Sequence, residues 1–285
     1  MRKIKIVAKE KSTVKKLLKL NSFSNRAIKD IIVNKKIRVN GNEICKNDFI
    51  NKDEFIEILL DEELLDYKPI KGTINIVYED ENIIVLIKPK NITVNSKNQI
   101  SLANYISYYF KEKNISSKIR YINRLDMGTS GLLMVAKNKY SQSFYQKEIE
   151  NNKVKKNYLA IVKNKFNKDG IYNVNLKYDE KYKNYYVSKK GDSAITEFKF
   201  LKYIKGYSFL NCKIYTGKTH QIRSTLSYLE FPIIGDELYG SDEKINKGFM
   251  LFAYKLEFNQ FLTNKKIILS YDPKEEIKDL FTKNM

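Results

Sequence analysis

The chain of 285 residues has 53 Lys and Arg against 33 Asp and Glu, a formal net charge of +20, with a pI of about 9.5. This excess of positive charge goes beyond what solubility requires and favours nucleic acid as a partner. Biased codon usage accounts for part of the lysine content. Cys45, Cys212 and His220 are too few for a zinc site with paired Cys or His ligands, and they argue against disulfide and Ser-His-Asp schemes. No segment approaches the ~20 apolar residues of a membrane span, so we expect a cytoplasmic protein.

The first 60 residues have the pattern of a small module. Residues 1 to about 12 predict a basic strand or arm, and Ser12 or Thr13 can cap a helix with Val14, Leu17, Leu18 and Leu20 on its apolar side. A second helix fits residues 24–33. Residues 35–44 alternate charged and apolar side chains around Asn-Gly, which predicts a hairpin.

Residues 61–72 have the composition of a linker, with Pro69, Gly72 and several acids, and a second domain should begin near Thr73. Two strands fit residues 74–78 and 83–87, and a helix fits residues 102–110. Further along, the pattern predicts a helix at 141–148, strands at 154–162, 194–200, 209–215, 250–256 and 267–269, and a terminal helix from Glu275. The length allows two unequal domains, at residues 1–65 and 73–285.

Residues 121–137 contain the main candidates for catalytic side chains. Arg124 and Asp126 precede two glycines and the apolar run 132–136, which predicts a polar bend at the edge of a sheet before a buried strand. Such a bend can direct Asp126 into a cleft. From spacing alone, the preferred interpretation is an ordinary ion pair between Arg124 and Asp126, with glycines that only turn the chain.

Five segments resemble RluA-type pseudouridine synthases. Arg-Leu-Asp, two residues and Thr-Ser-Gly-Leu at 124–132 resemble the catalytic motif, with Asn123 in place of the usual histidine. Lys-Pro-Lys-Asn at 88–91 resembles a Lys-Pro-x-Gly loop, and Asn91 can adopt the left-handed backbone that glycine provides there. Three further segments follow in the family's order: Lys-Asn-Tyr-Leu-Ala at 156–160, Thr-Gly-Lys-Thr-His-Gln-Ile-Arg at 216–223 and Pro-Ile-Ile-Gly-Asp-Glu-Leu-Tyr-Gly at 232–240.

The resemblance implies an α+β fold, with a mixed, mainly antiparallel sheet and flanking helices. It implies that Asp126 acts on the ribose as nucleophile or base, that Tyr158 lines the uracil pocket, and that Arg223 keeps Asp126 ionised. Arg124 is suited to stack in the space that the flipped base leaves. Asn123, Thr129 and Ile222 complete the expected substrate-binding set, and His220 is expected to form structural hydrogen bonds. The reaction implies no cofactor and no metal.

The order of helices and hairpin in residues 1–60 resembles the RNA-binding domain named after ribosomal protein S-four. This resemblance implies an RNA-binding face made of cations around the helix pair and hairpin: Lys15, Lys16, Lys19, Arg26, Lys29, Lys35, Lys36 and Arg38. The alternative for these residues is a solvated charged face.

An RNA-binding module ahead of a catalytic domain favours a large structured RNA. We therefore expect large-subunit ribosomal RNA as the substrate, with transfer RNA as the second choice, and a monomeric enzyme. Two rival functions are a catalytically inactive RNA-binding protein of the same fold, suggested by Asn123, and a nucleoside hydrolase, which fits the charge poorly.

Overall fold

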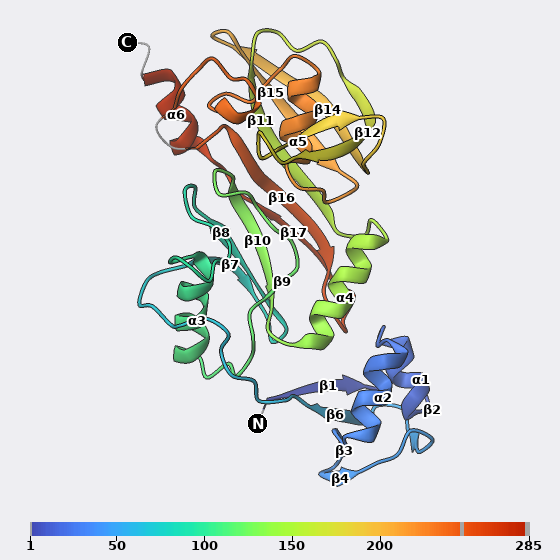
Figure 1. Cartoon of the computed structure of the whole chain (residues 1–285). Coiled ribbons are helices and arrows are strands. Elements are labelled where there is room, and N and C mark those ends of the chain that lie inside the picture. The colour runs from blue at the N-terminus through green and yellow to red at the C-terminus, as the bar shows by residue number, and fades with distance from the viewer. Residues whose placement is uncertain (1, 246–247, 283–285) are drawn as a thin grey trace.

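The computed structural model describes residues 2–245 and 248–282 (Figure 1). Residues 3–59 form a small sheet with the strand order β1-β6-β3-β4, a two-stranded pair β2-β5, and the helices α1 and α2. The bounds are β1 (Lys3–Val7), β2 (Ser12–Thr13), α1 (Val14–Leu20), α2 (Asn25–Val33), β3 (Ile37–Val39), β4 (Asn42–Glu43), β5 (Phe49–Ile50) and β6 (Phe55–Leu59).

The first helix begins after Thr13, one of the two predicted caps, and the second begins after Ser24, which was predicted as its first residue. Thr13 accepts from Lys16 N, and Ser24 accepts from Ala27 N, so each cap satisfies one free backbone donor of its helix. The β3–β4 hairpin turns at Asn40 and Gly41, whose φ angles of 50° and 83° are those of the predicted Asn-Gly turn. Leu20 was expected on the buried side of α1, but it is 60% exposed at the last helical position, beyond the neighbouring core.

The rest of the chain forms an 11-stranded sheet. Its main path has the order β13-β12-β14-β15-β11-β16-β10-β8-β7, and the other two strands of the sheet are β17, which pairs with β16, and β9, which pairs with β10. Among the described pairings β10–β16 is parallel and the others are antiparallel, so the mixed, mainly antiparallel α+β prediction is confirmed. The strands are β7 (Asn75–Glu79), β8 (Ile83–Lys88), β9 (Arg120–Tyr121), β10 (Ser130–Ala136), β11 (Lys155–Lys163), β12 (Gly170–Asp179), β13 (Asn184–Ser188), β14 (Asp192–Ile204), β15 (Tyr207–Ile214), β16 (Leu251–Asn259) and β17 (Lys266–Ser270).

The central strands β8 and β10 are buried on both faces, which explains their continuous apolar sequences. Ile84, Leu86, Leu133 and Val135 pack under α3 (Leu102–Glu112), whereas the alternating residues of the same strands pack under α4 (Lys139–Glu150). Three further helical segments, α5 (Gln221–Tyr228), the short η1 (Glu237–Tyr239) and α6 (Lys274–Thr282), complete the fold, and α5 packs against β12, β13 and β14.

The small part is docked firmly on the large one. The ring of Phe23 lies 5.4 Å from that of Tyr140 and 5.7 Å from that of Phe261, measured between centroids, and the two parts share one apolar core. Asp30 accepts from both Lys36 and Lys139, at 3.2 and 2.8 Å. Removing the first 60 residues would therefore expose apolar surface of the catalytic part.

The connection between β6 and β7 contains no helix or strand, but it is held in place. Glu63 Oε1 accepts from Arg120 at 2.5 Å, Asp66 accepts from Ile119 N at 3.0 Å, and Ile70 N donates to Asn104 O at 3.2 Å. No helix of the described chain is long and apolar enough to cross a membrane.

Candidate active site

Asp126 lies in the bend between β9 and β10, as the sequence predicted. Thr129 N donates to Asp126 O at 3.1 Å and closes the turn. Gly131 has a φ of 122°, and a Cβ there would lie 2.3 Å from Ala253 O of β16. A glycine is therefore required where β10 and β16 pair, and this close pairing sets the end of the loop that carries Asp126.

Arg223 of α5 joins two carboxylates. Its Nη1 donates to Asp126 Oδ2 at 3.0 Å, while Nε and Nη2 donate to the two oxygens of Asp236 at 2.7 and 2.8 Å. The side chains of Arg223 and Asp236 are 6% and 1% exposed, whereas that of Asp126 is 27% exposed. Asp236 therefore fixes the guanidinium, and the guanidinium in turn holds an accessible carboxylate.

Two rings enclose the same guanidinium. Its carbon lies 4.8 Å from the ring centroid of Tyr239 and 4.3 Å from that of Phe249, which is the geometry of cation–π contact. Burial disfavours the charged form of Arg223, but the hydrogen bonds and charges of Asp236 and Asp126 outweigh it, so the pKa of Arg223 is raised. A permanent positive charge thus lies beside Asp126.

Tyr158 of β11, Asp126 and Arg223 together line a cavity of about 60 Å³. The Tyr158 side chain is buried, and burial together with the negative charge of Asp126 raises the pKa of its phenol. The phenol is therefore neutral at physiological pH, which suits a ring that covers a uracil or donates a proton to it.

The remaining predicted substrate contacts divide into two groups. Arg124 is exposed at the mouth of this cavity, and Thr129 and Ile222 are buried in its wall. Asn123, by contrast, directs its side chain to the backbone of β10, where Nδ2 donates to Leu132 O at 3.2 Å and Oδ1 accepts from Met134 N at 2.8 Å. Asn123 thus ties the start of the loop to its own strand.

His220 forms a hydrogen bond, as expected, but it also lies near the carboxylate. Nδ1 is 2.9 Å from the Tyr239 hydroxyl, and Nε2 is 3.8 Å from Asp126 Oδ2. Burial lowers the pKa of His220, an effect that the positive charge of Arg223 reinforces and the charges of Asp126 and Asp236 oppose. The imidazole is therefore neutral at physiological pH and leaves Arg223 as the charged partner of Asp126.

The loop of Asp126 is supported from behind by residues 88–91. Lys88 is fully buried and its Nζ donates to Met127 O at 3.0 Å and to Pro89 O at 2.7 Å. Asn91 N donates to the same Met127 O at 2.9 Å, and its φ of 62° is the left-handed conformation predicted for it. Burial lowers the pKa of Lys88 to about 8, although the charges of Asp126 and Glu276 oppose this shift.

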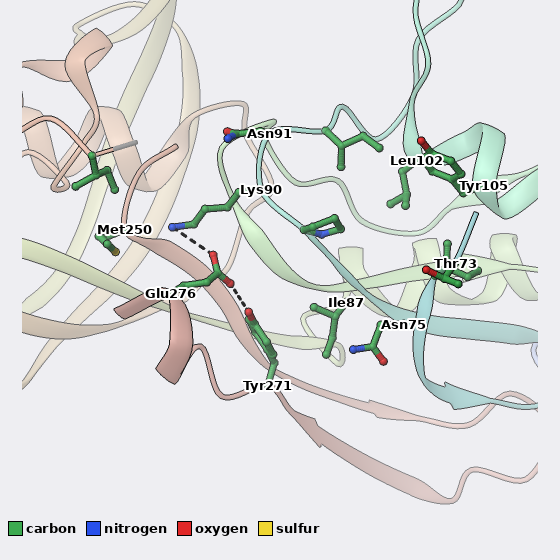
Figure 2. Close-up of a pocket in the computed structure, with 14 residues that line it drawn as sticks. Thr73, Asn75, Ile87, Lys90, Asn91, Leu102, Tyr105, Met250, Tyr271 and Glu276 are labelled. Carbon is green, nitrogen blue, oxygen red and sulfur yellow. Dashed lines mark hydrogen bonds and ion pairs between the residues drawn. The ribbon is translucent and has the colours of Figure 1, made fainter. Parts of the chain in front are cut away.

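The largest cavity described, about 850 Å³, is lined in part by residues 89–91 and not by Asp126 (Figure 2). Its lining is mostly apolar, and Figure 2 shows Glu276 between Lys90 and Tyr271, with Lys90 Nζ 3.4 Å from the carboxylate. Ser130 of β10 donates to Glu276 at 2.9 Å. We assign the chemistry to the smaller cavity, because it combines a carboxylate, a fixed cation and a phenol.

The cations expected to bind RNA in the first 60 residues differ in their exposure and in their ion pairs. Lys15, Arg26 and Lys29 are exposed and form no ion pair within the described chain. Lys16 pairs with Glu10 at 2.8 Å, and Lys35 and Arg38 lie 3.3 and 4.0 Å from Glu43. Lys36 is only 13% exposed, because it reaches Asp30 and Asp61 at the contact with α4.

Several residues of the site were not singled out from the sequence. Asp236 lay within a quoted motif, but its pairing with Arg223 depends on two segments meeting in space. Tyr239 belongs to the same motif but had been given no role, and Phe249 carried no signal among 15 phenylalanines. Lys88 was quoted only as part of a turn. Within the described residues, no cluster of His, Cys, Asp or Glu is arranged to hold a metal ion.

The fold and the site together define an enzyme with one accessible carboxylate, which is held by a buried arginine beside a neutral tyrosine at the edge of a mainly antiparallel sheet. The family model for RNA pseudouridylate synthase matches residues 82–228, about half of the chain. The chain belongs to the RNA pseudouridine synthase family, RluA type, and is an isomerase.

Curated relatives support this family. Ribosomal large subunit pseudouridine synthase D of Borreliella burgdorferi is 37% identical over 239 residues, which cover 78% of this chain and 73% of that protein. The uncharacterized RNA pseudouridine synthase YhcT of Bacillus subtilis is 29% identical, over 90% of this chain and 88% of its own. Human RNA pseudouridylate synthase domain containing 1 has a similar fold, with a TM-score of 0.61 at 21% identity over 73% of this chain and 87% of its own.

Proposed function

We propose that the enzyme isomerises uridines of large-subunit ribosomal RNA and that Asp126 performs the chemistry at the ribose. The contact of Arg223 with Asp126 carries this proposal, because it places a fixed cation beside the accessible carboxylate of a cavity that Tyr158 also lines. The choice of RNA is supported by the names of several relatives, among them the 37% identical synthase of Borreliella burgdorferi.

Asp126, Tyr158 and Arg124 each have a role in this scheme. The bond between ribose carbon 1 and base nitrogen 1 breaks, the uracil turns, and carbon 5 of the base joins the ribose, so that no group is gained or lost. A single carboxylate suffices, either as nucleophile or as the base that takes a proton from ribose carbon 2. Tyr158 covers the uracil, and exposed Arg124 fills the space that the flipped nucleotide leaves.

We further propose that residues 1–65 are an RNA-binding module of the S-four type and that residues 73–285 carry catalysis. The free cations Lys15, Arg26 and Lys29 are the candidates for phosphate contact. Since the first part shares a core with the second, substitution of these three by alanine is a cleaner test than truncation. The variant should modify full-length RNA more weakly, but a short stem-loop that contains the target normally.

Site-resolved pseudouridine mapping tests the substrate. In RNA from a deletion strain, we expect specific pseudouridines of large-subunit ribosomal RNA to be absent and to return with the wild-type gene but not with the Asp126→Asn variant. Loss confined to transfer RNA would overturn the ribosomal assignment. A cytoplasmic location and a monomeric state remain predictions from the sequence.

A further inference from the structure

We propose that the β12–β13 hairpin is a stacking platform that binds unpaired bases of the RNA next to the target uridine. The inference rests on the proposed function, because it assigns to the same site a second set of contacts with its RNA. Neither strand was predicted from the sequence, and the hairpin contains no residue of the motifs shared with the family.

The composition of the hairpin is unusual within the chain. Residues 177–190 contain four of the 21 tyrosines and five lysines against two acids. One of the acids, Asp179, is used in the turn, where it accepts from Lys181 N at 2.9 Å and from Tyr182 N at 3.1 Å. The lysines, none of which pairs with a carboxylate of the described chain, are Lys177, Lys181, Lys183, Lys189 and Lys190.

The register places two of the tyrosines in line with the active site. Tyr178 of β12 lies directly opposite Tyr185 of β13, and their ring centroids are 5.1 Å apart. The Tyr185 ring is in turn 5.7 Å from the ring of His220, which lines the cavity of Asp126. Three rings therefore form a row that starts at the catalytic cavity and crosses from β13 to β12.

The outer end of this row is open to solvent. Tyr178 is 45% exposed, and Tyr182 in the turn is 60% exposed, with Lys181 Nζ 5.0 Å from its ring centroid. Tyr185, nearer to the cavity, is half-buried. Exposed rings with free ammonium groups beside them are the combination that binds single-stranded nucleic acid, since bases stack on the rings and phosphates meet the cations.

The row is also fixed relative to Asp126. Tyr185 N donates to the Tyr239 hydroxyl at 2.9 Å, and the same hydroxyl contacts His220. The ring of Tyr239 packs on Arg223, so the hairpin is joined by contacts to the group that holds Asp126. Figure 1 shows β12 beside α5, the helix that supplies Arg223. A base that stacks on this row would thus be held at a set distance from the flipped uridine.

The platform should select unpaired RNA over duplex. Bases within an A-form duplex already stack on each other and present no free face to a tyrosine. A nucleotide beside a flipped uridine has lost one stacking neighbour, and the row offers it a replacement.

Binding of a short oligoadenylate tests the platform, because this RNA contains no uridine and cannot enter the reaction. We expect Tyr178→Ala in the otherwise intact enzyme to weaken binding by about 5- to 100-fold, the effect of losing one stacked base, with no change in the salt dependence. Tyr178→Phe keeps the ring and should bind as the wild type does. An alanine variant with wild-type affinity would overturn the proposal, and so would a phenylalanine variant as weak as the alanine one.

Tyr186→Ala is the matched control. Tyr186 is on the same hairpin and is 40% exposed, but it lies opposite Lys177 on the other face, away from His220. The Tyr186→Ala variant should bind oligoadenylate within about twofold of the wild type. An equal loss of affinity in Tyr178→Ala and Tyr186→Ala would refute the proposal that bases stack on one face of the hairpin. A protein partner for this face would leave oligoadenylate binding unchanged in all variants. Pseudouridine mapping tests the proposed function separately, because oligoadenylate binding requires no turnover.

Discussion

Arg223 donates to Asp126 at 3.0 Å across 97 residues of sequence, while its other two donors hold the buried Asp236. The arginine is thus positioned by one carboxylate so that it can act on another. Because the Asp236 carboxylate is 1% exposed, its charge is stabilised by this pairing and not by water.

Replacing Asp126 by asparagine should abolish turnover and leave RNA affinity within several-fold. In the proposed mechanism the carboxylate performs the chemistry, whereas many dispersed cations bind the RNA. Single-turnover rates and binding of the same RNA separate the two effects. A variant with the full single-turnover rate would refute the role of Asp126.

Asp236→Ala should lower the free energy of unfolding by about 3–5 kcal/mol, because it leaves Arg223 buried with half of its partners. Activity should fall as well, since the guanidinium is no longer held toward Asp126. Denaturant unfolding measures the first effect. Asp242→Ala is the control: its pairing with Lys163 is at the surface, with Asp242 72% exposed, and its loss should change the free energy of unfolding little. Similar losses in both variants would contradict the buried role of Asp236.

Lys88→Met should lower kcat by up to about 10²-fold with little change in RNA affinity, because Met127 O and Pro89 O lose their donor and the loop of Asp126 shifts. Since burial lowers the pKa of Lys88 to about 8, its charge is lost as the pH rises through that value. The wild-type kcat should therefore decline above pH 8. A pH profile of the same shape in Lys88→Met would show that another group causes the decline.

Lys156→Met should stabilise the protein. Lys156 is 8% exposed, contacts no carboxylate of the described chain, and burial lowers its pKa from 10.5 to about 8. Between these two pH values the unfolded chain binds more protons than the folded one, so wild-type stability rises with pH across this window. The variant should gain up to about 3 kcal/mol at pH 7, and the gain should shrink from pH 8 to 10.5.

Thermal or denaturant unfolding at both ends of this pH range measures the effect of Lys156. Lys155→Met is the control, because the neighbouring Lys155 is exposed and should change stability little at either pH. A gain for Lys156→Met that does not depend on pH would indicate better apolar packing and no relief of a buried charge.

The sequence by itself determined the local elements and the family. Caps at Thr13 and Ser24, the Asn-Gly turn at residues 40–41, and the uninterrupted apolar strand after Gly131 each depend on neighbouring residues, so their physical causes can be recognised in the linear chain. The strands β12 and β13 escaped prediction because their lysines, tyrosines and asparagines lack a buried apolar face, and α5 because it is short and polar.

Only the tertiary structure decided how the active site is built. Asp236, Tyr239 and Phe249 act through Arg223, and Lys88 through Met127, over separations that no periodic pattern encodes. Lys36 looked like a free cation beside Arg38, yet folding brings Asp30 and Asp61 against it. The reason is physical: hydrogen bonds and ion pairs act over a few ångströms in space, and the distance between two side chains far apart in the chain is set by the packing of the whole sheet.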